Sequence, residues 1–339
     1  MATPFFSVVI DNHNYGRFLR QAIESVLSQD FKDLELIVVD DGSTDGSREM
    51  LSSYGSRLRA LLQQRQGQAT AFNRGLSEAR GELVCLLDSD DVFRPGKLSA
   101  LAPLFDDPKV GGAEHWLEDA DEGLSPVPQH FPAWPPRYRL EDFLEARTEF
   151  TATSGLCFRR KALERALPIP ADLFYYLDDF LTVRVLLDAE IANLPKPLGV
   201  HRLHGCNWCA GGYEDPVKLD KDFKNREIFL RHMESWLADR GVKTSPRFAQ
   251  KQSLEILRRK VLREALRAEP GRAWDLWWEG WKAAPGGRFA LFRMITLALA
   301  VISPSLYLSF YSGYSSWGGL KRLRLRLFPE NGGGATVSN

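Results

Sequence analysis

Short apolar segments rich in β-branched residues alternate with segments of helical periodicity through the first part of the chain. The apolar segments, which have the composition of buried strands, are residues 5–10, 34–39, 58–64 and 83–87. Between them, apolar residues recur at helical spacing over residues 19–27, 47–54 and 69–79. Strands that alternate with helices form right-handed βαβ units around a mostly parallel sheet. This alternation constrains the fold more than any other feature, and it predicts an α/β domain.

Three of the predicted strands end in polar loops, at residues 11–16, 40–46 and 88–91. In open α/β sheets, ligands bind outside the carboxyl ends of the strands. We therefore expect one rim of the sheet to collect six carboxylates: Asp11, Asp40, Asp41, Asp88, Asp90 and Asp91. Carboxylates in one crevice repel each other unless a cation or ligand donors compensate. A single aspartate is more often a helix cap or a turn residue, but that interpretation does not account for the whole set.

Composition narrows the classes of function. The 339 residues are enough for one large domain and a smaller one. Because 44 Lys+Arg balance 44 Asp+Glu, and proteins that coat nucleic acid carry a basic excess, we expect no nucleic acid among the partners. Four Cys exclude a disulfide scaffold. Residues 1–10 do not have the pattern of a secretory signal, so we expect a cytoplasmic location.

Several segments resemble, in order and spacing, the family 2 glycosyltransferases of the GT-A fold. The specific matches are residues 7–10, 22–29, 38–46, 73–75 and 87–91. A weaker resemblance continues to about residue 210 through residues 153–155, 158–160, 178–179 and 202–205. The resemblance implies a Rossmann-like, mostly parallel sheet flanked by helices, to which this chain adds a C-terminal helical region. It also implies inverting transfer of a sugar from a nucleotide-sugar donor to an acceptor hydroxyl, with Mg²⁺ or Mn²⁺ bound.

The resemblance places the cation and the diphosphate at residues 88–91. It implies direct contact with the metal for Asp90 and a place in the same site for Asp88. Oxygen ligands suit Mg²⁺ and Mn²⁺, and phosphates and waters fill the remaining coordination positions. Asp91 is expected to bind there or to cap the following turn. His204, in the late Arg/His segment, is implied as a further metal or phosphate ligand.

The family pattern also implies a set of nucleotide-sugar-binding residues: Asp11, His13, Asp40, Asp41, Gly67, Asn73, Arg74, Asp88 and Ser89. Asp41 is the expected reader of the base through a ring N–H, which favours uracil or thymine, with Asp40 as its structural neighbour. Arg74 is expected to neutralise phosphate or else to form a surface ion pair. The first loop departs from the commonest family pattern, because His13 stands where an aromatic ring often stacks, and Asp11 adds a carboxylate without an assigned role.

The catalytic base should be a carboxylate that faces the acceptor hydroxyl, opposite the leaving group. By the resemblance this is Asp179, with Asp178 as the reserve. General-base catalysis contributes roughly 10²–10⁴ in rate. The alternative is that both residues only start a helix over residues 181–187, because acidic side chains favour helix N-termini.

Two other segments carry open alternatives. His201, His204, Cys206 and Cys209 are close enough for a zinc site, and the Cys-x-x-Cys spacing also suits a redox pair, but the second half of a usual zinc motif is missing. The segment 114–138 is rich in Pro and is expected to be an irregular insertion. Its aromatic residues either stack on acceptor sugars or simply pack; they are Trp116, Phe131, Trp134 and Tyr138.

The second half is predicted to be helical, over residues 220–237 and 248–266. Four tryptophans share one helix face, which suits helix packing or a membrane interface: Trp274, Trp277, Trp278 and Trp281. Residues 294–311 are mainly apolar, but Ser303-Pro304 interrupts them. Basic residues flank this segment on both sides, which suits a monotopic membrane segment better than a spanning helix. A soluble core or a dimer interface through these helices is the remaining alternative.

These observations predict four regions. They are a GT-A catalytic domain at residues 1–215, a helical extension at 216–286, an apolar and basic segment at 287–330, and a disordered tail at 331–339. The leading hypothesis is a metal-dependent glycosyltransferase that uses a UDP- or dTDP-sugar, peripheral or monotopic at the inner face of the cell membrane. Its acceptor would be a carbohydrate or a lipid-linked sugar, in polysaccharide or glycolipid synthesis. A nucleotidyltransferase and a non-catalytic nucleotide-sugar scaffold are the alternatives, whereas a dehydrogenase is disfavoured because no Gly-x-Gly-x-x-Gly follows the first strand.

Overall fold

The computed structural model describes residues 3–205, 207, 214–283 and 288–309. By its internal contacts the chain divides into two compact units, Met1–Gly205 with Ile228–Ser245, and Cys206–Glu227 with Pro246–Asn339. Helix α8 therefore contributes residues to both units. The four regions expected from the sequence remain a prediction, and the tail at 331–339 lies outside the described residues.

The first unit is built on one mixed sheet. Within the described residues nine strands follow the order β3-β2-β1-β4-β8-β6-β9-β5, with β7 paired to β9. Their bounds are β1 Phe6–Asn12, β2 Leu34–Asp41, β3 Arg59–Gln63, β4 Leu83–Asp88, β5 Val92–Phe93, β6 Val110–Ala120, β7 Arg137–Tyr138, β8 Leu156–Arg159 and β9 Glu190–Arg202. Strands β3, β2, β1 and β4 are parallel, as the alternation of strands and helices predicts, whereas β8 pairs antiparallel with both β4 and β6.

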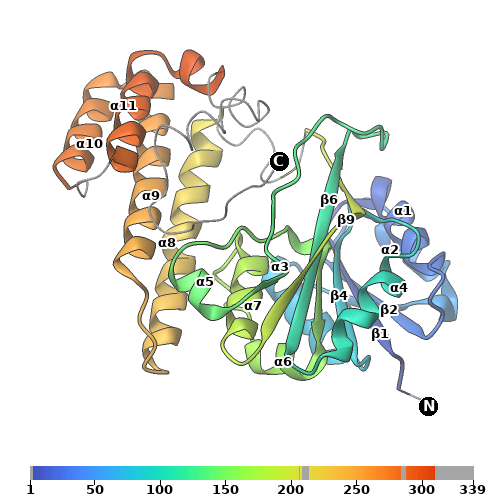
Figure 1. Cartoon of the computed structure of the whole chain (residues 1–339). Coiled ribbons are helices and arrows are strands. Elements are labelled where there is room, and N and C mark those ends of the chain that lie inside the picture. Colours follow the sequence, from blue (N-terminus) through green and yellow to red (C-terminus); the bar gives the residue numbers. More distant parts are fainter. Residues whose placement is uncertain (1–2, 206, 208–213, 284–287, 310–339) are drawn as a thin grey trace. The chain divides into compact units, whose positions relative to one another are not determined.

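Helices cover both faces of this sheet (Figure 1). One face carries α1 Gly16–Leu27, α2 Ser47–Ser52 and α4 Lys97–Leu101, and the other carries α3 Gln68–Glu78, α6 Arg160–Ala166 and α7 Leu177–Leu186. Shorter elements complete the unit: α5 Leu140–Leu144, η1 Gly55–Arg57, η2 Ala102–Asp106 and η3 Thr153–Gly155. The period of two in β1 explains the layering, because Phe6, Val8 and Ile10 are buried in one cluster with Leu19 and Ile23 of α1.

Helix α3 approaches the sheet closely, and a glycine makes this possible. A Cβ atom on Gly75 would lie 2.5 Å from Val9 Cγ1 and 2.9 Å from Val39 Cγ2. Only a residue without a side chain therefore fits between the helix and strands β1 and β2. The N-terminal end of α3 is held at the carboxyl end of β2 by a separate contact, in which the N–H of Gly67 donates to Asp41.

The sequence-based prediction of an irregular segment over residues 114–138 was wrong in its first part. Residues 114–120 belong to β6, which pairs with β9 along its whole length. The segment resembles a loop in the sequence because Glu114 and His115 are polar, yet both side chains are fully buried in the sheet. Non-local pairing thus overrides the local composition, and the irregular chain begins only at Asp121.

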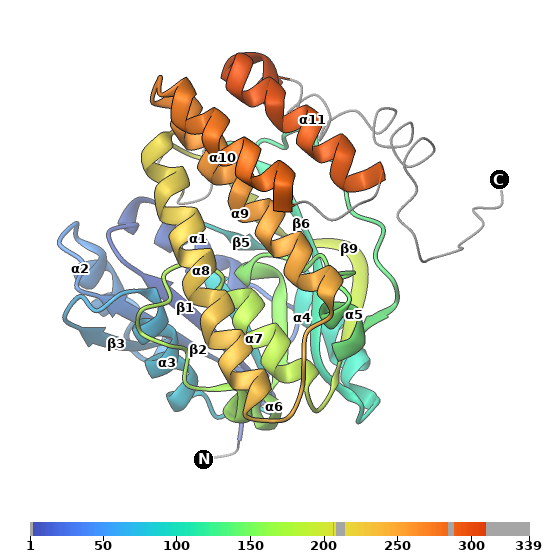
Figure 2. The ribbon, with the colours of Figure 1, turned by 90° about the vertical axis from the view of Figure 1, so that its left-hand side faces the viewer.

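The second unit is helical, as expected. It contains the part of α8 (Pro216–Ala238) up to Glu227, followed by α9 Pro246–Leu266, α10 Pro270–Ala283 and α11 Arg288–Ile302 (Figure 2). Leu254, Val261 and Leu262 of α9 are buried in one apolar cluster with Ala273 of α10 and Met294 of α11. Glu255 binds Arg258, Arg259 and Arg293, and although burial opposes ionisation, these cations lower the pKa of Glu255 to about 2.

The four tryptophans of α10 divide between two environments. Trp277 and Trp281 stack with their ring centroids 5.2 Å apart and pack against the apolar cluster. Trp274 and Trp278, in contrast, leave 40% and 51% of their surface exposed. The helical spacing predicts that all four tryptophans share one face. In the structure, two of them pack within the unit and the other two are exposed.

Helix α11 ends at Ile302, immediately before Ser303-Pro304, where the sequence predicts the interruption. Among the described residues there is no helix whose length and hydropathy would let it cross a membrane. The basic residues that follow, from Lys321 to Arg326, lie outside the described part of the chain.

Candidate functional site

The carboxyl ends of strands β2, β1 and β4 lie side by side, because these strands are parallel. In the register of the sheet Asp11 pairs with Asp88, and Asn12 pairs with Asp40. Three of the aspartates predicted to share a rim thus occupy neighbouring strand ends. Asp11 and Asp88 are 77 positions apart in the sequence, and the βαβ connections bring them together.

Asp11, Asp88 and Asp91 form a crowded acidic group at this rim. Burial, followed by the charges of Asp11, Asp91, Asp90 and Asp178, raises the pKa of Asp88 well above its usual value. Burial and the charge of Asp90 likewise raise the pKa of Asp11 to about 7. Within the described residues, the buried Oδ1 of Asp11 and Oδ2 of Asp91 have no hydrogen-bond partner. Such orphaned carboxylate oxygens fit a hard divalent cation, which would relieve the repulsion.

Asp90 and His204 come together beside this group. Their Oδ2 and Nε2 atoms are 3.0 Å apart, and the buried imidazole packs against the rings of Tyr15 and Phe18. Arg202 fixes the arrangement, since its Nε donates to the carbonyl of Asp90 at 2.7 Å. No group of three or more His, Cys, Asp or Glu side chains in the described residues forms a complete metal cage. A carboxylate and an imidazole still fit Mg²⁺ or Mn²⁺, because substrate phosphates and waters supply further ligands.

At the end of β2 the two neighbouring aspartates have different surroundings. Asp40 is fully buried and binds Asn12, Ser43 and Arg48. Burial alone would raise the pKa of Asp40, but hydrogen bonds from Ser43 and Arg48 lower it below the usual value. Asp40 therefore binds neighbouring protein groups in the interior, where it holds the segment that follows β2.

Asp41, the expected reader of the base, is engaged by protein donors. Its Oδ1 accepts from Gln63 Nε2 and from the N–H of Gln66, and its Oδ2 accepts from the N–H of Gly67 at 2.7 Å. Gly67 has a positive φ of 95°, which suits glycine and turns this N–H toward Asp41. His13 lies beside them, with Nδ1 2.7 Å from the carbonyl of Asp41. The carboxylate thus joins β2 to the start of α3.

Two further residues expected beside the nucleotide are held by the chain itself. The amide of Asn73 donates to the carbonyl of Ile169 and accepts from its N–H, both at 2.8 Å. Arg74 donates to the carbonyl of Leu62 at 2.7 Å. Ser89, between Asp88 and Asp90, is buried.

The expected acceptor side lies at the start of α7. This helix begins at Leu177, so Asp178 and Asp179 occupy its first turn, as the alternative interpretation also requires. Asp178 Oδ1 accepts from the N–H of Asp179 at 2.9 Å. Asp178 is close enough to Asp88 for its charge to raise the pKa of Asp88. The carboxylates of α7 and those of the strand ends are therefore neighbours.

Sequence reasoning missed the groups that hold these carboxylates. Ser154, fully buried in η3, accepts from the N–H of Asp88 through Oγ at 3.1 Å and from Lys97 Nζ through its carbonyl at 2.8 Å. Gln68 donates to Asp88 Oδ1 at 3.1 Å. The matched segment 153–155 is the sequence signal for Ser154, whereas no motif in the sequence singles out Lys97.

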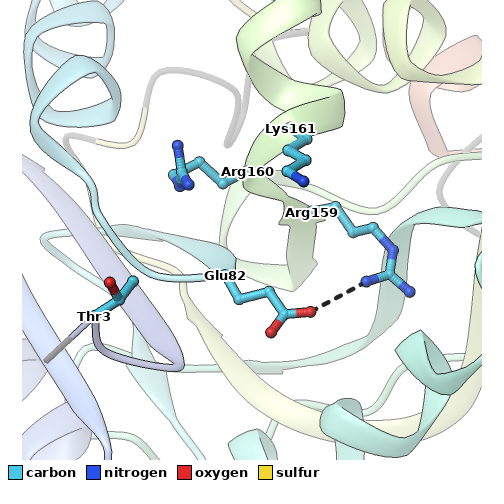
Figure 3. Close-up of a pocket in the computed structure, with 5 residues that line it drawn as sticks. All are labelled: Thr3, Glu82, Arg159, Arg160 and Lys161. Carbon is cyan, nitrogen blue, oxygen red and sulfur yellow. Dashed lines mark hydrogen bonds and ion pairs between the residues drawn. The ribbon is translucent and has the colours of Figure 1, made fainter.

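A pocket of about 310 Å³ lies away from this site (Figure 3). Its lining residues are Thr3, Glu82, Arg159, Arg160 and Lys161. Thr3 and Glu82 precede β1 and β4, so the pocket is at the opposite ends of these strands from the aspartates. Arg159 pairs with Glu82 at 3.4 Å, and Arg160 donates to the carbonyl of Gly81. Because these cations serve the fold, the pocket is not part of the candidate site.

The structure describes only part of the possible zinc or redox site, and it describes the aromatic residues of segment 114–138. Cys206 and Cys209 lie outside the described residues, and His201 binds Asp119 at 3.0 Å.

Trp116 stacks on Phe131 with ring centroids 4.7 Å apart, and the ring centroid of Trp134 lies 6.2 Å from that of Trp116. The aromatic residues therefore pack on one another, and a face such as that of Phe131, 37% exposed, remains accessible.

Residues 7–167 match the sequence profile described as glycosyl transferase family 2. An uncharacterized glycosyltransferase, alr2836, of Nostoc sp. is 35% identical over 212 residues, which cover 59% of this chain and 65% of that protein. A GalNAc(5)-diNAcBac-PP-undecaprenol beta-1,3-glucosyltransferase of Campylobacter jejuni is 40% identical over 103 residues, which cover 29% of this chain and 33% of that protein. The chain thus spans less than two thirds of the length of these curated relatives.

A solved structure shares the fold. It is a mannosyltransferase from Pyrobaculum calidifontis in complex with GDP-Man and Mn²⁺, with a TM-score of 0.53 and 20% identity, and the match covers 94% of this chain and 89% of that chain. The similarity confirms the predicted fold class, a GT-A arrangement of a mixed α/β sheet with flanking helices and a C-terminal helical region.

Proposed function

We propose, from the match of residues 7–167 to glycosyl transferase family 2, that the chain is an inverting glycosyltransferase that moves a sugar from a nucleoside-diphosphate sugar to an acceptor hydroxyl. One observation carries the proposal: carboxylates from β1, β4 and α7 meet at one rim, where burial and mutual repulsion raise the pKa of Asp88. A site that concentrates unpaired negative charge is suited to a cation that brings a diphosphate with it. The catalytic part is the region predicted as residues 1–215.

A divalent cation, Mg²⁺ or Mn²⁺, is the cofactor in this proposal. Asp90 and His204 hold it, because their Oδ2 and Nε2 atoms are adjacent, with Asp88 on the same rim. When bound, the ion supplies Lewis-acid stabilisation of the leaving diphosphate. The similar mannosyltransferase structure contains Mn²⁺, which supports this choice of ion.

The donor is a UDP- or dTDP-sugar. Asp41 and His13 are adjacent at the carboxyl ends of β2 and β1, where the base would lie, and uracil and thymine each present one ring N–H. The three protein donors on Asp41 leave its remaining lone pair to select the base. The solved relative binds GDP-Man, so the test must also include a guanine nucleotide.

Asp179 is the general base of the reaction, with Asp178 beside it. It removes the proton from the acceptor hydroxyl as that oxygen attacks the sugar from the face opposite the diphosphate. The first turn of α7 suits an ionised carboxylate, because the positive end of the helix dipole favours negative charge there.

The acceptor is a carbohydrate or lipid-linked sugar presented at the cytoplasmic membrane surface. α10 and α11 carry an exposed apolar surface in the second unit, made of Trp274, Trp278, Leu291, Ile295 and Ile302. Exposed indole and aliphatic side chains suit the interface between water and lipid. The relative from Campylobacter jejuni is named for an undecaprenol-linked substrate, which supports such an acceptor. A dimer through the same helices is the competing use of this surface.

Thermal-shift screening tests the proposal directly, because a ligand of the native state raises its melting temperature. UDP-, dTDP- and GDP-sugars are compared with and without Mn²⁺. We expect one pyrimidine nucleotide-sugar to raise the melting temperature only when Mn²⁺ is present, and to release its nucleoside diphosphate on incubation. Binding without any release of diphosphate would favour a non-catalytic scaffold instead.

A further inference from the structure

Glu114 is a buried carboxyl group that the proposed reaction does not use. It lies in β6, where it pairs with Leu156 of β8 and Asn193 of β9, and its side chain has no exposed surface. Its Oε2 accepts from the N–H of Thr151 at 3.0 Å. Its Oε1 has no hydrogen-bond partner within the described residues. A buried carboxyl group with a single hydrogen bond to a backbone N–H needs an explanation.

The segment that Glu114 binds, residues 151–155, is a junction between both sides of the candidate site. Ser154 accepts from the N–H of Asp88 and from Lys97 Nζ. The backbone of Thr153 lies beside the carboxyl of Asp178, where it lowers the pKa of Asp178 against the effect of burial. One short turn therefore contacts the diphosphate side through Asp88 and the acceptor side through Asp178.

This turn is also tightly packed. A Cβ atom on Gly155 would lie 2.5 Å from Thr151 Cγ2 and 3.0 Å from the carbonyl oxygen of His115. The turn thus rests directly on β6 next to Glu114. A displacement of Thr151 would be passed along residues 152–154, since close packing leaves no space to absorb it.

The charge state of Glu114 suits a role in holding the chain. Burial, together with the negative charges of Asp179 and Glu149, raises the pKa of Glu114 to about 8, against the hydrogen bond from Thr151. At neutral pH the group is therefore mostly uncharged, and it adds no repulsion to the carboxylates at the start of α7. Glutamine has the same shape and can accept the same hydrogen bond.

We propose that Glu114 is a positioning residue, which anchors the turn 151–155 and through it aligns the first turn of α7 with Asp88. The inference rests on the proposed glycosyltransferase reaction, for which Asp179 and Asp88 lie on opposite sides of the donor sugar. Glu114 itself contacts neither substrate. It acts through the backbone of Thr151.

The test compares Glu114→Leu and Glu114→Gln with the wild-type full chain, and Glu35→Gln serves as a matched control. Glu35 is a half-buried glutamate in β2 that binds Ser7 and Arg80, remote from the turn. Amide hydrogen exchange is followed at residues 151–155 and at Asp88, with binding of UDP and Mn²⁺ and turnover of the donor measured in parallel. If Glu114→Leu does not fold, Glu114→Asp, whose carboxyl is too short to reach Thr151, replaces it.

We expect Glu114→Leu to speed exchange in the turn and at Asp88, and to lower kcat about tenfold or more. The donor KM and UDP affinity should stay close to wild type, because β4 is held independently by its pairing with β1. Glu114→Gln should restore slow exchange and most of the turnover.

Unchanged exchange in Glu114→Leu would overturn the inference, and so would a Glu114→Gln variant as slow as Glu114→Leu, because the carboxyl would then act by titration. Parallel losses of kcat, UDP affinity and melting temperature would assign Glu114 to general stability. If the wild-type chain turns over no nucleotide-sugar, the proposed reaction fails, while the exchange experiment still decides whether Glu114 holds the turn.

Discussion

At the scale of single residues, the site is defined by carboxylates whose charges the native fold leaves partly uncompensated. Asp88 is affected by four other aspartates, and Asp11 and Asp91 each retain a buried oxygen without a partner in the described residues. Such an arrangement opposes folding of the unliganded chain, since like charges repel. The proposed divalent cation would supply the missing positive charge.

Asp90→Asn should prevent binding of the cation and thereby transfer. The variant keeps the size of the side chain and the carbonyl that accepts from Arg202, so the fold should be preserved. We expect the Mn²⁺-dependent rise in melting temperature with UDP to disappear and kcat/KM to fall about 10²-fold or more. Exposed Asp30→Asn serves as the control. Wild-type Mn²⁺ dependence in Asp90→Asn would remove this residue from the cation site.

Asp179→Asn should separate binding from chemistry. Because the base acts only on the acceptor hydroxyl, donor affinity should remain while kcat falls by roughly 10²–10⁴. Isothermal titration with UDP and Mn²⁺ checks the first expectation, and a diphosphate-release assay checks the second. Asp178→Asn is measured beside it, since a larger loss of turnover in that variant would transfer the role of base to Asp178.

At the scale of elements, α11 has two apolar faces. One face, with Met294, Leu297 and Ala300, is buried against its own unit. The other exposes Leu291 by 45%, Ile295 by 58% and Ile302 by 70%. Large exposed apolar patches mark interaction surfaces, and the exposed tryptophans of α10 are compatible with the proposed lipid surface.

The double substitution Ile295→Asp with Ile302→Asp should weaken binding to membranes without unfolding the chain, because both side chains are exposed. Flotation with vesicles that contain anionic lipid measures the bound fraction, and we expect it to fall several-fold. Leu62→Asp, an equally simple change at a residue 46% exposed in the first unit, is the control. A chain that never floats with vesicles, but changes its oligomeric state on substitution, would point to a dimer interface.

At the scale of the whole molecule, stability should depend on pH in a specific direction. Burial would lower the pKa of His201, but its hydrogen bond to Asp119 and the charges of Asp91 and Asp119 raise it to about 9 from 6.5. Burial raises the pKa of Glu114 to about 8 from 4.5. Both groups bind a proton more tightly in the native state. Their stabilising effect is complete below the unfolded-state pKa and is lost as pH rises through the native-state pKa.

We therefore expect the melting temperature of the unliganded chain to fall as pH rises from about 6.5 to about 9. Differential scanning calorimetry at constant ionic strength measures the trend. The substitution His201→Asn should flatten the slope, since the proton it removes is bound mainly in the folded state. A melting temperature that rises over this range would contradict the assignment of charge to His201.

The sequence alone predicts much of this molecule, because its strongest signals are local. Apolar runs of five to seven residues predict β1, β2, β3 and β4 within one or two positions, and helical spacing predicts α1, α3 and α9. Since parallel strands end at a common edge, the same pattern also predicts which aspartates share a rim. The matched segments extend this to the family before any coordinate is known.

Only the tertiary structure decides what surrounds each of these side chains. It brings Asp90 to His204 across 114 positions, encloses Asp41 with donors from β3 and from the loop before α3, and buries Glu114, which looks like a loop residue in the sequence. Periodicity and motifs describe residues close together along the chain, whereas burial, charge state and hydrogen bonding depend on residues brought together by the sheet. For that reason the sequence identifies the acidic residues, and the folded chain determines which of them remain available to a ligand.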